Sequence, residues 1–486
     1  MNILIIMADQ HNARYLGCAD HPVIRTPNLD RLAAAGARFP AAYCSSPLCG
    51  PSRMSFLSGL YPCHSGVYAN GQPLPSDIPT YAHALGAAGY ATALAGRMHI
   101  VGDDQRHGFE EKIGPDVTAS TLGGGMMPLL EGLHAGSGPA GLTLSGPGDS
   151  SYQHYDDDVV AQSCAWLRRR DAARPFCLTV GLALPHNPFV CAPDDYAMYA
   201  GRISLREDPE NLHPAWHPAI DAFKRAGVTR EDQLRALAAY AGSVTATDRR
   251  VGRLLDTLDQ LDLAGDTLVV YTSDHGETAG AHGLWYKCSA YEGSAAVPLI
   301  LRLPGRIPPG RLQPECVNLV DLTATVLDLA GAPALPDSDG RSFRGLWADP
   351  SAPWDNTTFC EYGTRWGRSL LLRMVRHDAM KYVYYHGQPD ELFDLAADPE
   401  ERANRAEHPD YQTTRQELRQ LVMRGWNPEQ VNAWLDLWGR RESILYQWYA
   451  SRPRNDPELY QPPPGCNRLD LAPGFKPKPT IIRGSY

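Results

Sequence analysis

The chain has 486 residues, of which 43% are hydrophobic and 21% are charged, and these proportions are typical of a globular protein. This length predicts one large domain and a smaller one. The formal net charge of −10 and the lack of a Lys/Arg-rich run argue against a nucleic-acid partner. No run reaches the roughly 18 apolar residues that a membrane-spanning helix needs, so we expect no membrane partner.

The first residues and the cysteines predict a cytoplasmic location. The segment NILIIMAD after Met1 lacks the basic start, the long apolar stretch and the small-residue cleavage site of a signal peptide. The 11 cysteines are scattered without a paired spacing. Such an odd number predicts mostly buried free thiols in a reducing compartment.

Short apolar runs alternate with amphipathic segments through the first part of the chain. This alternation predicts an α/β fold with a mostly parallel sheet covered by helices on both faces. Thr229 and Asp232 have the spacing of a capping box at the start of a long helix. In chain order we expect a strand at Asn2–Met7, a helix at Thr26–Phe39, a helix and then a strand within Thr80–Gly96, a helix at Asp156–Arg170, a strand at Phe176–Pro185, a helix at Thr229–Leu261 and a strand at Thr267–Ser273.

The glycine-rich segment 121–150 has no periodicity, so we expect a long loop inserted in a catalytic domain that spans residues 1–350. Beyond residue 350 the pattern changes to that of an antiparallel sheet. Residues 351–452 are therefore expected to form a smaller α+β subdomain. Its predicted elements are two strands within Ser369–Gly387, a third at Glu391–Leu395 and a helix that begins near Pro399.

The last segment, residues 453–486, is rich in proline. We expect an extended tail that lies over the body of the protein or over a neighbouring subunit. The second arrangement would make the protein a homo-oligomer.

Polar side chains follow the predicted strands at the points where those strands end. Asp9 and Gln10 follow the first strand, and Asp274 and His275 follow the last. Ligands bind at the carboxyl ends of parallel strands, and carboxylate oxygens, an amide oxygen and an imidazole suit a divalent cation. A single Asp after a strand often only caps a turn, but the two pairs together favour a metal site.

Four basic residues also lie near predicted strand ends or in loops. Arg97 and His99 follow one strand, His186 follows another, and Lys287 lies in the loop LWYKCSAYEG. Each one alone could be a surface residue or a satisfied core residue. Beside a metal, the group would match the charge of a tetrahedral oxyanion.

The segment SPLCGPSRMSF, residues 46–56, places Cys49 before a Gly-Pro turn and Arg53 on the first turn of a predicted helix. The helix N-terminus and the guanidinium, aimed back toward the cysteine, would activate a thiolate. A buried, inert thiol is the alternative, since free cysteine is among the most buried residue types.

Cys49-Gly50-Pro51-Ser52-Arg53 matches the signature C-x-P-S-R, and the chain resembles the formylglycine-dependent sulfatases of the alkaline phosphatase superfamily. The resemblance covers nearly the whole chain. Its other segments are NILIIMADQ, TPNLDRLAAAGARF, GYATALAGRMH, the histidine of LPHNP, SDHGE and KYVYYHGQPDELFDLAADPEE. Within the family, GVYANG, RMHIVGDDQRHGFEE and LWYKCSAYEGSAAVPLI are most similar to choline sulfatases and their close relatives.

The resemblance implies a role for each candidate residue. Cys49 would be oxidised to formylglycine by a formylglycine-generating enzyme that reads Pro51 and Arg53. The hydrated aldehyde would be the nucleophile, assisted by Arg53. His186 and Lys287 would assist departure of the alcohol, Arg97 would bind a sulfate oxygen, and His99 would take the proton that releases sulfate. The implied metal ligands are Asp9, Gln10, residue 49, Asp274 and His275.

Three positions depart from the common family pattern. Gln10 and His275 stand where many sulfatases have Asp and Asn, and Arg97 stands where most have Lys. The loss of one negative charge and the added imidazole admit Mn²⁺ beside Ca²⁺, with Mg²⁺ also possible. The substrate implied is a small sulfate monoester such as choline sulfate or an aryl sulfate.

The Gln/His pair also resembles phosphonate monoester hydrolases of the same superfamily, so a phosphonate monoester or phosphodiester hydrolase is the alternative enzyme. A dinuclear zinc phosphatase is disfavoured, because it needs further Asp and His ligands and a Ser or Thr nucleophile. A catalytically silent relative that binds anions would result if Cys49 stayed a thiol.

Overall fold

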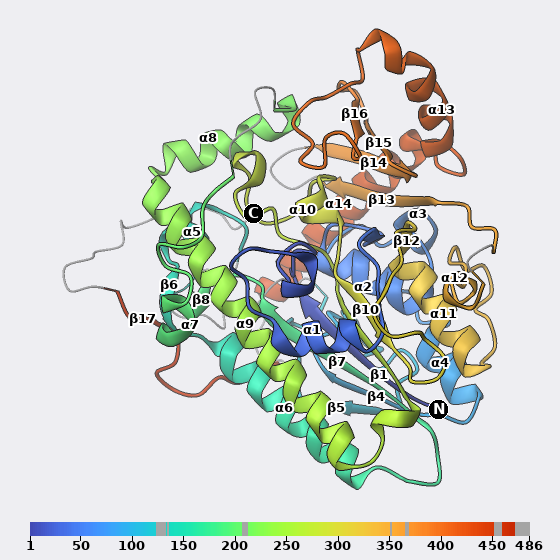
Figure 1. Ribbon diagram of the computed structural model, residues 1–486. Coiled ribbons are helices and arrows are strands. Elements are labelled where there is room, and N and C mark those ends of the chain that lie inside the picture. Colours follow the sequence, from blue (N-terminus) through green and yellow to red (C-terminus); the bar gives the residue numbers. More distant parts are fainter. Residues whose placement is uncertain are drawn as a thin grey trace.

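The computed structural model describes residues 1–122, 133, 136–206, 212–349, 352–364, 369–451 and 459–471. A large sheet with the order β11-β2-β10-β9-β1-β7-β4-β5 forms its centre (Figure 1). Only the pairs that β10 makes with β9 and β2 are antiparallel. The predicted, mostly parallel sheet is therefore confirmed. Its strands are β1 (Asn2–Asp9), β2 (Ala37–Arg38), β4 (Ala91–Gly96), β5 (Glu111–Ile113), β7 (Phe176–Pro185), β9 (Thr267–Ser273), β10 (Leu299–Arg302) and β11 (Arg311–Leu312).

Helices cover both faces of this sheet, because its central strands are apolar on both sides. In β1, Ile3, Ile5 and Met7 belong to one apolar core, whereas Leu4, Ile6 and Ala8 belong to the other. The second core is closed by α6 (Ser151–Arg169) and α9 (Arg230–Gln260), which run across the front of Figure 1. The first core is closed by α2 (Cys49–Ser58), α4 (Tyr81–Ala87) and α11 (Leu319–Ala330).

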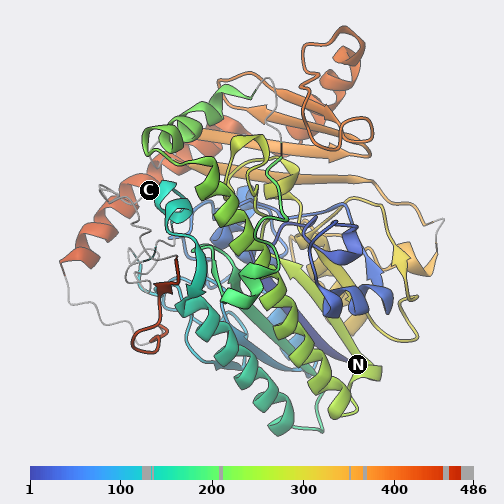
Figure 2. The same cartoon turned by 60° about the vertical axis from the view of Figure 1, so that its left-hand side comes forward.

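A second sheet, fully antiparallel, lies in the C-terminal part of the chain and is drawn in orange at the top of Figures 1 and 2. Its strands are β13 (Thr357–Thr364), β14 (Leu370–His377), β15 (Met380–Tyr385) and β16 (Glu391–Asp394). The helices α13 (Gln412–Val422) and α14 (Pro428–Ala450) pack against this sheet. The predicted C-terminal antiparallel sheet is confirmed, while the domain boundaries at residues 350 and 452 remain predictions.

The remaining elements are short. The two-residue strands β3 (Ala42–Tyr43) and β12 (Val317–Asn318) pair with each other, and β8 (Val190–Cys191) and β17 (Arg468–Leu469) flank β6 (Gly146–Asp149). The other helices are α1 (Pro27–Ala34), α3 (Pro62–Ser65), α5 (Pro139–Thr143), α7 (Pro193–Ala197), α8 (His217–Arg225), α10 (Glu292–Ala295) and α12 (Gly345–Ala348).

The predicted helix at Thr26–Phe39 is too long. Helix α1 ends at Ala34, and the chain enters β2 at Ala37. A Cβ atom on Gly36 would lie 2.1 Å from the carbonyl oxygen of Leu301, so the chain passes directly against β10 at this glycine. Pairing with β10 therefore overrides the helical pattern of the residues that follow α1.

Three predictions in the later segments also differ from the structure. The segment 121–150, expected to be a loop, contains α5 and β6, while residues 123–132, 134 and 135 lie outside the described residues. No helix begins near Pro399 in the described structure, where Glu401 has a φ of 56° and α13 starts at Gln412. Strand β13 was missed because it carries polar residues such as Glu361, which is buried and paired with Arg373.

The described part of the proline-rich tail, residues 459–471, lies against the body of the protein. The Tyr460 amide donates to the Asp116 carbonyl at 2.8 Å, and β17 pairs with β6. Residues 453–458 and 472–486 lie outside the described residues. Across the described chain, no helix is both long enough and apolar enough to cross a membrane.

Candidate active site

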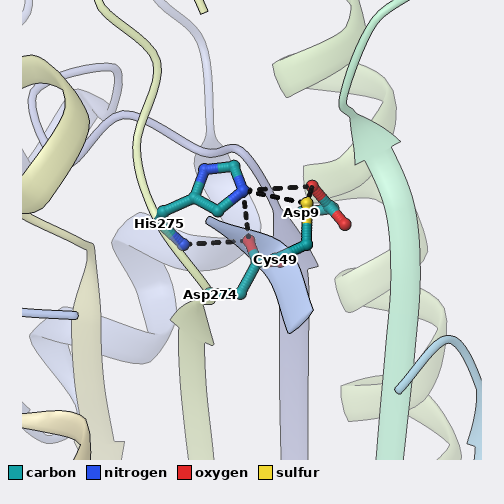
Figure 3. A group of neighbouring side chains, drawn as sticks. All are labelled: Asp9, Cys49, Asp274 and His275. Carbon is teal, nitrogen blue, oxygen red and sulfur yellow. Dashed lines mark hydrogen bonds and ion pairs between the residues drawn. The ribbon is translucent and has the colours of Figure 1, made fainter. Parts of the chain in front are cut away.

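Four of the predicted site residues, Asp9, Cys49, Asp274 and His275, meet beside the carboxyl ends of β1 and β9 (Figure 3). Asp9 is the last residue of β1, and Asp274 and His275 directly follow β9. Because β1 and β9 are parallel neighbours, these residues meet at one edge of the sheet. Gln10 turns the chain away from β1 with a φ of 67°, a conformation that non-glycine residues rarely adopt.

Cys49 is the first residue of α2 and is completely buried. Its Sγ lies 3.1 Å from His275 Nε2, 3.2 Å from Lys287 Nζ and 3.7 Å from Asp9 Oδ1. Burial alone would raise the pKa of this thiol, but the positive charges of Lys287 and His275 outweigh burial and hold the pKa well below its usual value. The sulfur therefore lies among basic side chains and possible metal ligands.

Arg53 lies one turn further along α2 and is also fully buried. Its Nε donates to Asp274 Oδ2 at 2.9 Å and its Nη2 to Asp9 Oδ2 at 3.1 Å. The guanidinium thus joins the two carboxylates, whereas the sequence predicted that it would aim at the cysteine. This clamp fixes which oxygen of each carboxylate remains on the side of Cys49.

The donor set fits a divalent cation. One atom from each of Asp9, Cys49, Asp274 and His275 lies within 4.8 Å of the others. The Nδ1 of His275 is hydrogen-bonded to the Gly276 carbonyl at 2.9 Å, so the other ring nitrogen, Nε2, is the one that faces Cys49. That nitrogen lies 3.8 Å from Asp9 Oδ1 and 3.7 Å from Asp274 Oδ1. Electron pairs aimed at one point are the arrangement that a bound cation satisfies.

The Gln10 side chain is oriented by three partners. Its Oε1 accepts a hydrogen bond of 2.7 Å from Lys287 Nζ. Its Nε2 donates to a carboxylate oxygen of Glu277 and, at 3.4 Å, to Asn187 Oδ1. The amide oxygen therefore faces Lys287, which also contacts Cys49.

Arg97 and His99 lie in the segment that follows β4, and Arg97 Nη2 is 3.4 Å from His99 Nδ1. Arg97 is bound through Nε to Asp9 Oδ2 at 2.6 Å. His99 has a φ of 60° and a buried Nε2 that has no hydrogen-bond partner among the described residues. The loop is held by Asp116, whose Oδ2 accepts the amide protons of Met98 and His99 at 2.9 and 3.0 Å. An unpaired ring nitrogen in such a site is a free proton acceptor or donor for a ligand.

His186 follows the end of β7 and is buried. Its Nδ1 is hydrogen-bonded to the Asn187 carbonyl at 2.5 Å, so Nε2 is available to the site. Burial, followed by repulsion from Lys287, lowers the pKa of His186. The structure thus brings together the residues that the sequence predicted for the site.

Comparison with known proteins identifies the family. The family model described as "Sulfatase" matches residues 1–332, and one described as "N-sulphoglucosamine sulphohydrolase, C-terminal" matches residues 280–426. The chain belongs to the sulfatase family. It is therefore an enzyme, a sulfuric ester hydrolase.

Relatives of this sulfatase extend over nearly its whole length. It is 34% identical to a choline-sulfatase of Rhizobium meliloti over 92% of this chain and 93% of that protein. It is 29% identical to an arylsulfatase of Clostridium perfringens over 87% of this chain and 94% of that protein. The solved phosphonate monoester hydrolase of Agrobacterium radiobacter is similar with a TM-score of 0.74 and 24% identity, covering 87% and 94% of the two chains, which shows a shared fold.

Three polar residues of this sulfatase's site were not found from the sequence. Glu277 and Asn187 hold Gln10, and Asp116 holds the loop of His99. Glu277 had a possible signal, because it lies three positions after Asp274 in SDHGE. Asp116 had none, since it lies 17 positions from the histidine whose backbone it binds.

Proposed function

We propose that this sulfatase hydrolyses a small, soluble sulfate monoester, with choline sulfate or an aryl sulfate as the substrate. The observation that carries the proposal is the fully buried Cys49 at the start of α2, in contact with Lys287 and His275. Arg97 and His186 add further donors for an oxyanion. The named functions of the Rhizobium and Clostridium relatives support these two substrate classes.

We propose that Cys49 is oxidised to formylglycine by a formylglycine-generating enzyme. The hydrated aldehyde then has two hydroxyls on one carbon. One hydroxyl attacks sulfur while the bond between sulfur and the ester oxygen breaks, and His186 and Lys287 assist the departing alcohol. Arg97 would bind a sulfate oxygen beside Asp9.

His99 would complete the reaction. It would be the base that takes the proton of the second hydroxyl, and its place beside Arg97, whose Nη2 lies 3.4 Å from His99 Nδ1, supports this role. The carbonyl then re-forms as the bond between carbon and the sulfate oxygen breaks, which releases sulfate and restores the aldehyde. Two hydroxyls on one carbon explain why an aldehyde is used, because no water has to attack a hindered sulfur.

Asp9, Gln10, Asp274 and His275 would hold one divalent cation, Ca²⁺, Mn²⁺ or Mg²⁺, beside residue 49. The cation would supply a positive charge that favours the ionised form of the attacking hydroxyl. Arg53 would keep the Asp9 and Asp274 carboxylates oriented for this task through its two ion pairs.

The experiment is a comparison of kcat/KM for choline sulfate, an aryl sulfate and an aryl phosphonate monoester. The protein is produced together with a formylglycine-generating enzyme, and conversion at position 49 is measured by peptide mass. A sulfate preferred by orders of magnitude, with activity lost in Cys49→Ala, supports the proposal. Activity that is equal with and without conversion of Cys49 would overturn the mechanism.

Phosphonate monoester hydrolysis is the second candidate. The observation that favours it is the pair of an amide, Gln10, and an imidazole, His275, at the metal site in place of Asp and Asn. The same pair resembles phosphonate monoester hydrolases of this superfamily, and the solved Agrobacterium enzyme of that name shares the fold. A preference for the phosphonate in the same experiment would select this candidate.

We further propose a cytoplasmic location and a homo-oligomeric state. The location is supported by the 11 cysteines, all of which are free thiols. The oligomer is supported by three exposed apolar side chains on the last turns of α14, Ile444, Tyr446 and Trp448. Cell fractionation tests the location, and light scattering of the full chain tests the oligomer.

A further inference from the structure

The amide of Gln10 can act as a metal ligand only when its oxygen faces the metal. Oxygen and nitrogen occupy nearly the same space in an amide, so packing alone does not choose between the two orientations. The hydrogen-bond partners of Gln10 must make this choice. Lys287 offers only donors, and it lies 2.7 Å from Gln10 Oε1.

Glu277 acts at the other end of the same amide. Its carboxylate is completely buried, and its Oε1 accepts the backbone amide protons of Ala279 at 2.9 Å and Tyr286 at 2.5 Å. These two bonds fix the rotation of the carboxylate, so Oε2 faces Gln10 Nε2 and accepts its proton. A carboxylate here accepts only, and it would repel the amide oxygen if the amide were reversed.

We propose that Glu277 is a positioning residue that fixes the amide of Gln10 with its oxygen toward the metal site. This inference rests on the proposed binding of a divalent cation at Gln10. Asn187 Oδ1, at 3.4 Å from the same nitrogen, is a weaker acceptor that supports the same orientation. Glu277 would affect the metal indirectly. It accepts the hydrogen bond of Gln10 Nε2, and this leaves the oxygen of Gln10 toward the metal site.

The variant Glu277→Gln tests this polarity with almost no change in shape. The two backbone donors hold the amide oxygen of the new side chain at the position of Oε1. Its amino group then faces the amino group of Gln10, so two donors meet. Gln10 is expected to reverse and to present nitrogen toward the metal. We expect the dissociation constant for Mn²⁺ to rise by about 10- to 100-fold, measured by calorimetry on the full chain.

A second substitution should restore the arrangement. In Glu277→Gln with Gln10→Glu, the new carboxylate accepts from the new amino group and keeps an oxygen toward Lys287 and the metal. The double variant has the same formal charge as the unchanged protein. We expect its Mn²⁺ affinity to return to within a few-fold of the unchanged protein, a rescue that a purely structural role of Glu277 does not predict.

The unchanged protein, the single variants Glu277→Gln and Gln10→Glu, and the double variant are also compared without metal, by urea unfolding. Each single variant should lower the unfolding midpoint, and the double variant should recover most of the loss. Glu391→Gln is the matched control for a buried glutamate outside the site, and its Mn²⁺ affinity should be unchanged. If the double variant does not recover its unfolding midpoint without metal, the hydrogen bond between Glu277 and Gln10 does not orient the amide, and the proposal is wrong.

The metal titrations separate this inference from the proposed function. If the unchanged protein binds Mn²⁺ and Glu277→Gln binds it equally well, Glu277 is not a positioning residue. The proposed metal site is then unaffected. An unchanged protein that binds no divalent cation overturns both. Weakened binding in Glu277→Gln with rescue in the double variant supports the positioning role.

Discussion

Lys287 and Lys381 are both buried, but their surroundings differ in a way that separates a reactive region from a structural one. Lys381, on β15, lies 2.9 Å from Glu292 Oε1 and 2.7 Å from Glu401 Oε1. Lys287 contacts an amide oxygen at 2.7 Å and the Cys49 sulfur at 3.2 Å, and its described hydrogen bonds include no carboxylate. Lys381 is therefore paired with two carboxylates, whereas the described hydrogen bonds of Lys287 go to a neutral amide oxygen and to a sulfur.

The two carboxylates around Lys381 link β15 to α10 and to the segment that follows β16. Glu292 begins α10, and its amide donates to Glu401 Oε2 at 2.7 Å. Burial would raise the pKa of Glu292, but Lys381 and Arg376 outweigh it and lower that pKa to about 2. Buried charges that neutralise one another hold elements together, and Lys381 with Glu292 and Glu401 is such a group.

Among the substitutions that test the difference between the two lysines, Lys381→Met should have the largest effect. Removing the lysine leaves Glu292 and Glu401 buried beside each other, so the free energy of unfolding should fall by about 3–5 kcal/mol. Urea unfolding measures this loss, and kcat/KM of the folded protein should change by less than about twofold. The exposed Lys224 gives the control variant Lys224→Met. A loss as small as that of the control would contradict the structural role of Lys381.

Lys287→Met should lower activity and leave stability nearly unchanged, which is the reverse of the result expected for Lys381→Met. The variant loses a donor to the substrate oxyanion, so kcat/KM for the preferred sulfate should fall by about 10²- to 10³-fold. The free energy of unfolding should change by about 1 kcal/mol or less, because the lost bond to Gln10 is offset by removal of a desolvated charge. The comparison fails if this variant loses several kcal/mol of stability and keeps its activity.

The smallest effect concerns Glu391, which accepts hydrogen bonds from Tyr291 and Tyr385 at 2.7 and 2.6 Å. Burial raises the pKa of Glu391 to about 7 in the folded protein. The native state therefore binds more protons than the unfolded chain between about pH 4.5 and pH 7, and stability falls as pH rises through this interval.

Glu391→Gln should remove this pH dependence. From pH 5 to pH 8, the unfolding free energy of the unchanged protein should fall relative to that of the variant by at most about 3 kcal/mol. Urea unfolding at both pH values measures the difference. Parallel changes with pH in the two proteins would show that Glu391 does not titrate in this range.

The central strands were predictable because each is buried on both faces. The predicted boundaries of β7 and β9 agree with the structure at both ends, and the capping box of α9 at Thr229 and Asp232 is present. The shortest strands of this sheet were not predictable in the same way. Strands β2 and β11 have two residues each, which is too short for a periodic pattern.

The sequence by itself determined the chemistry of the site. Residue types and their places after strands were enough to bring Asp9, Gln10, Asp274 and His275 together, because parallel strands end at one edge. The motif around Cys49 pointed to the sulfatase family before any contact was known, and the family comparison confirms it.

Only the tertiary structure decided how these groups are oriented. Arg53 turns to the two carboxylates rather than to Cys49, and Glu277 holds the amide of Gln10, to which it is joined across 267 positions of sequence. The direction of a hydrogen bond depends on which partners surround a side chain in space. Those partners come from distant segments, so no local pattern in the chain records them.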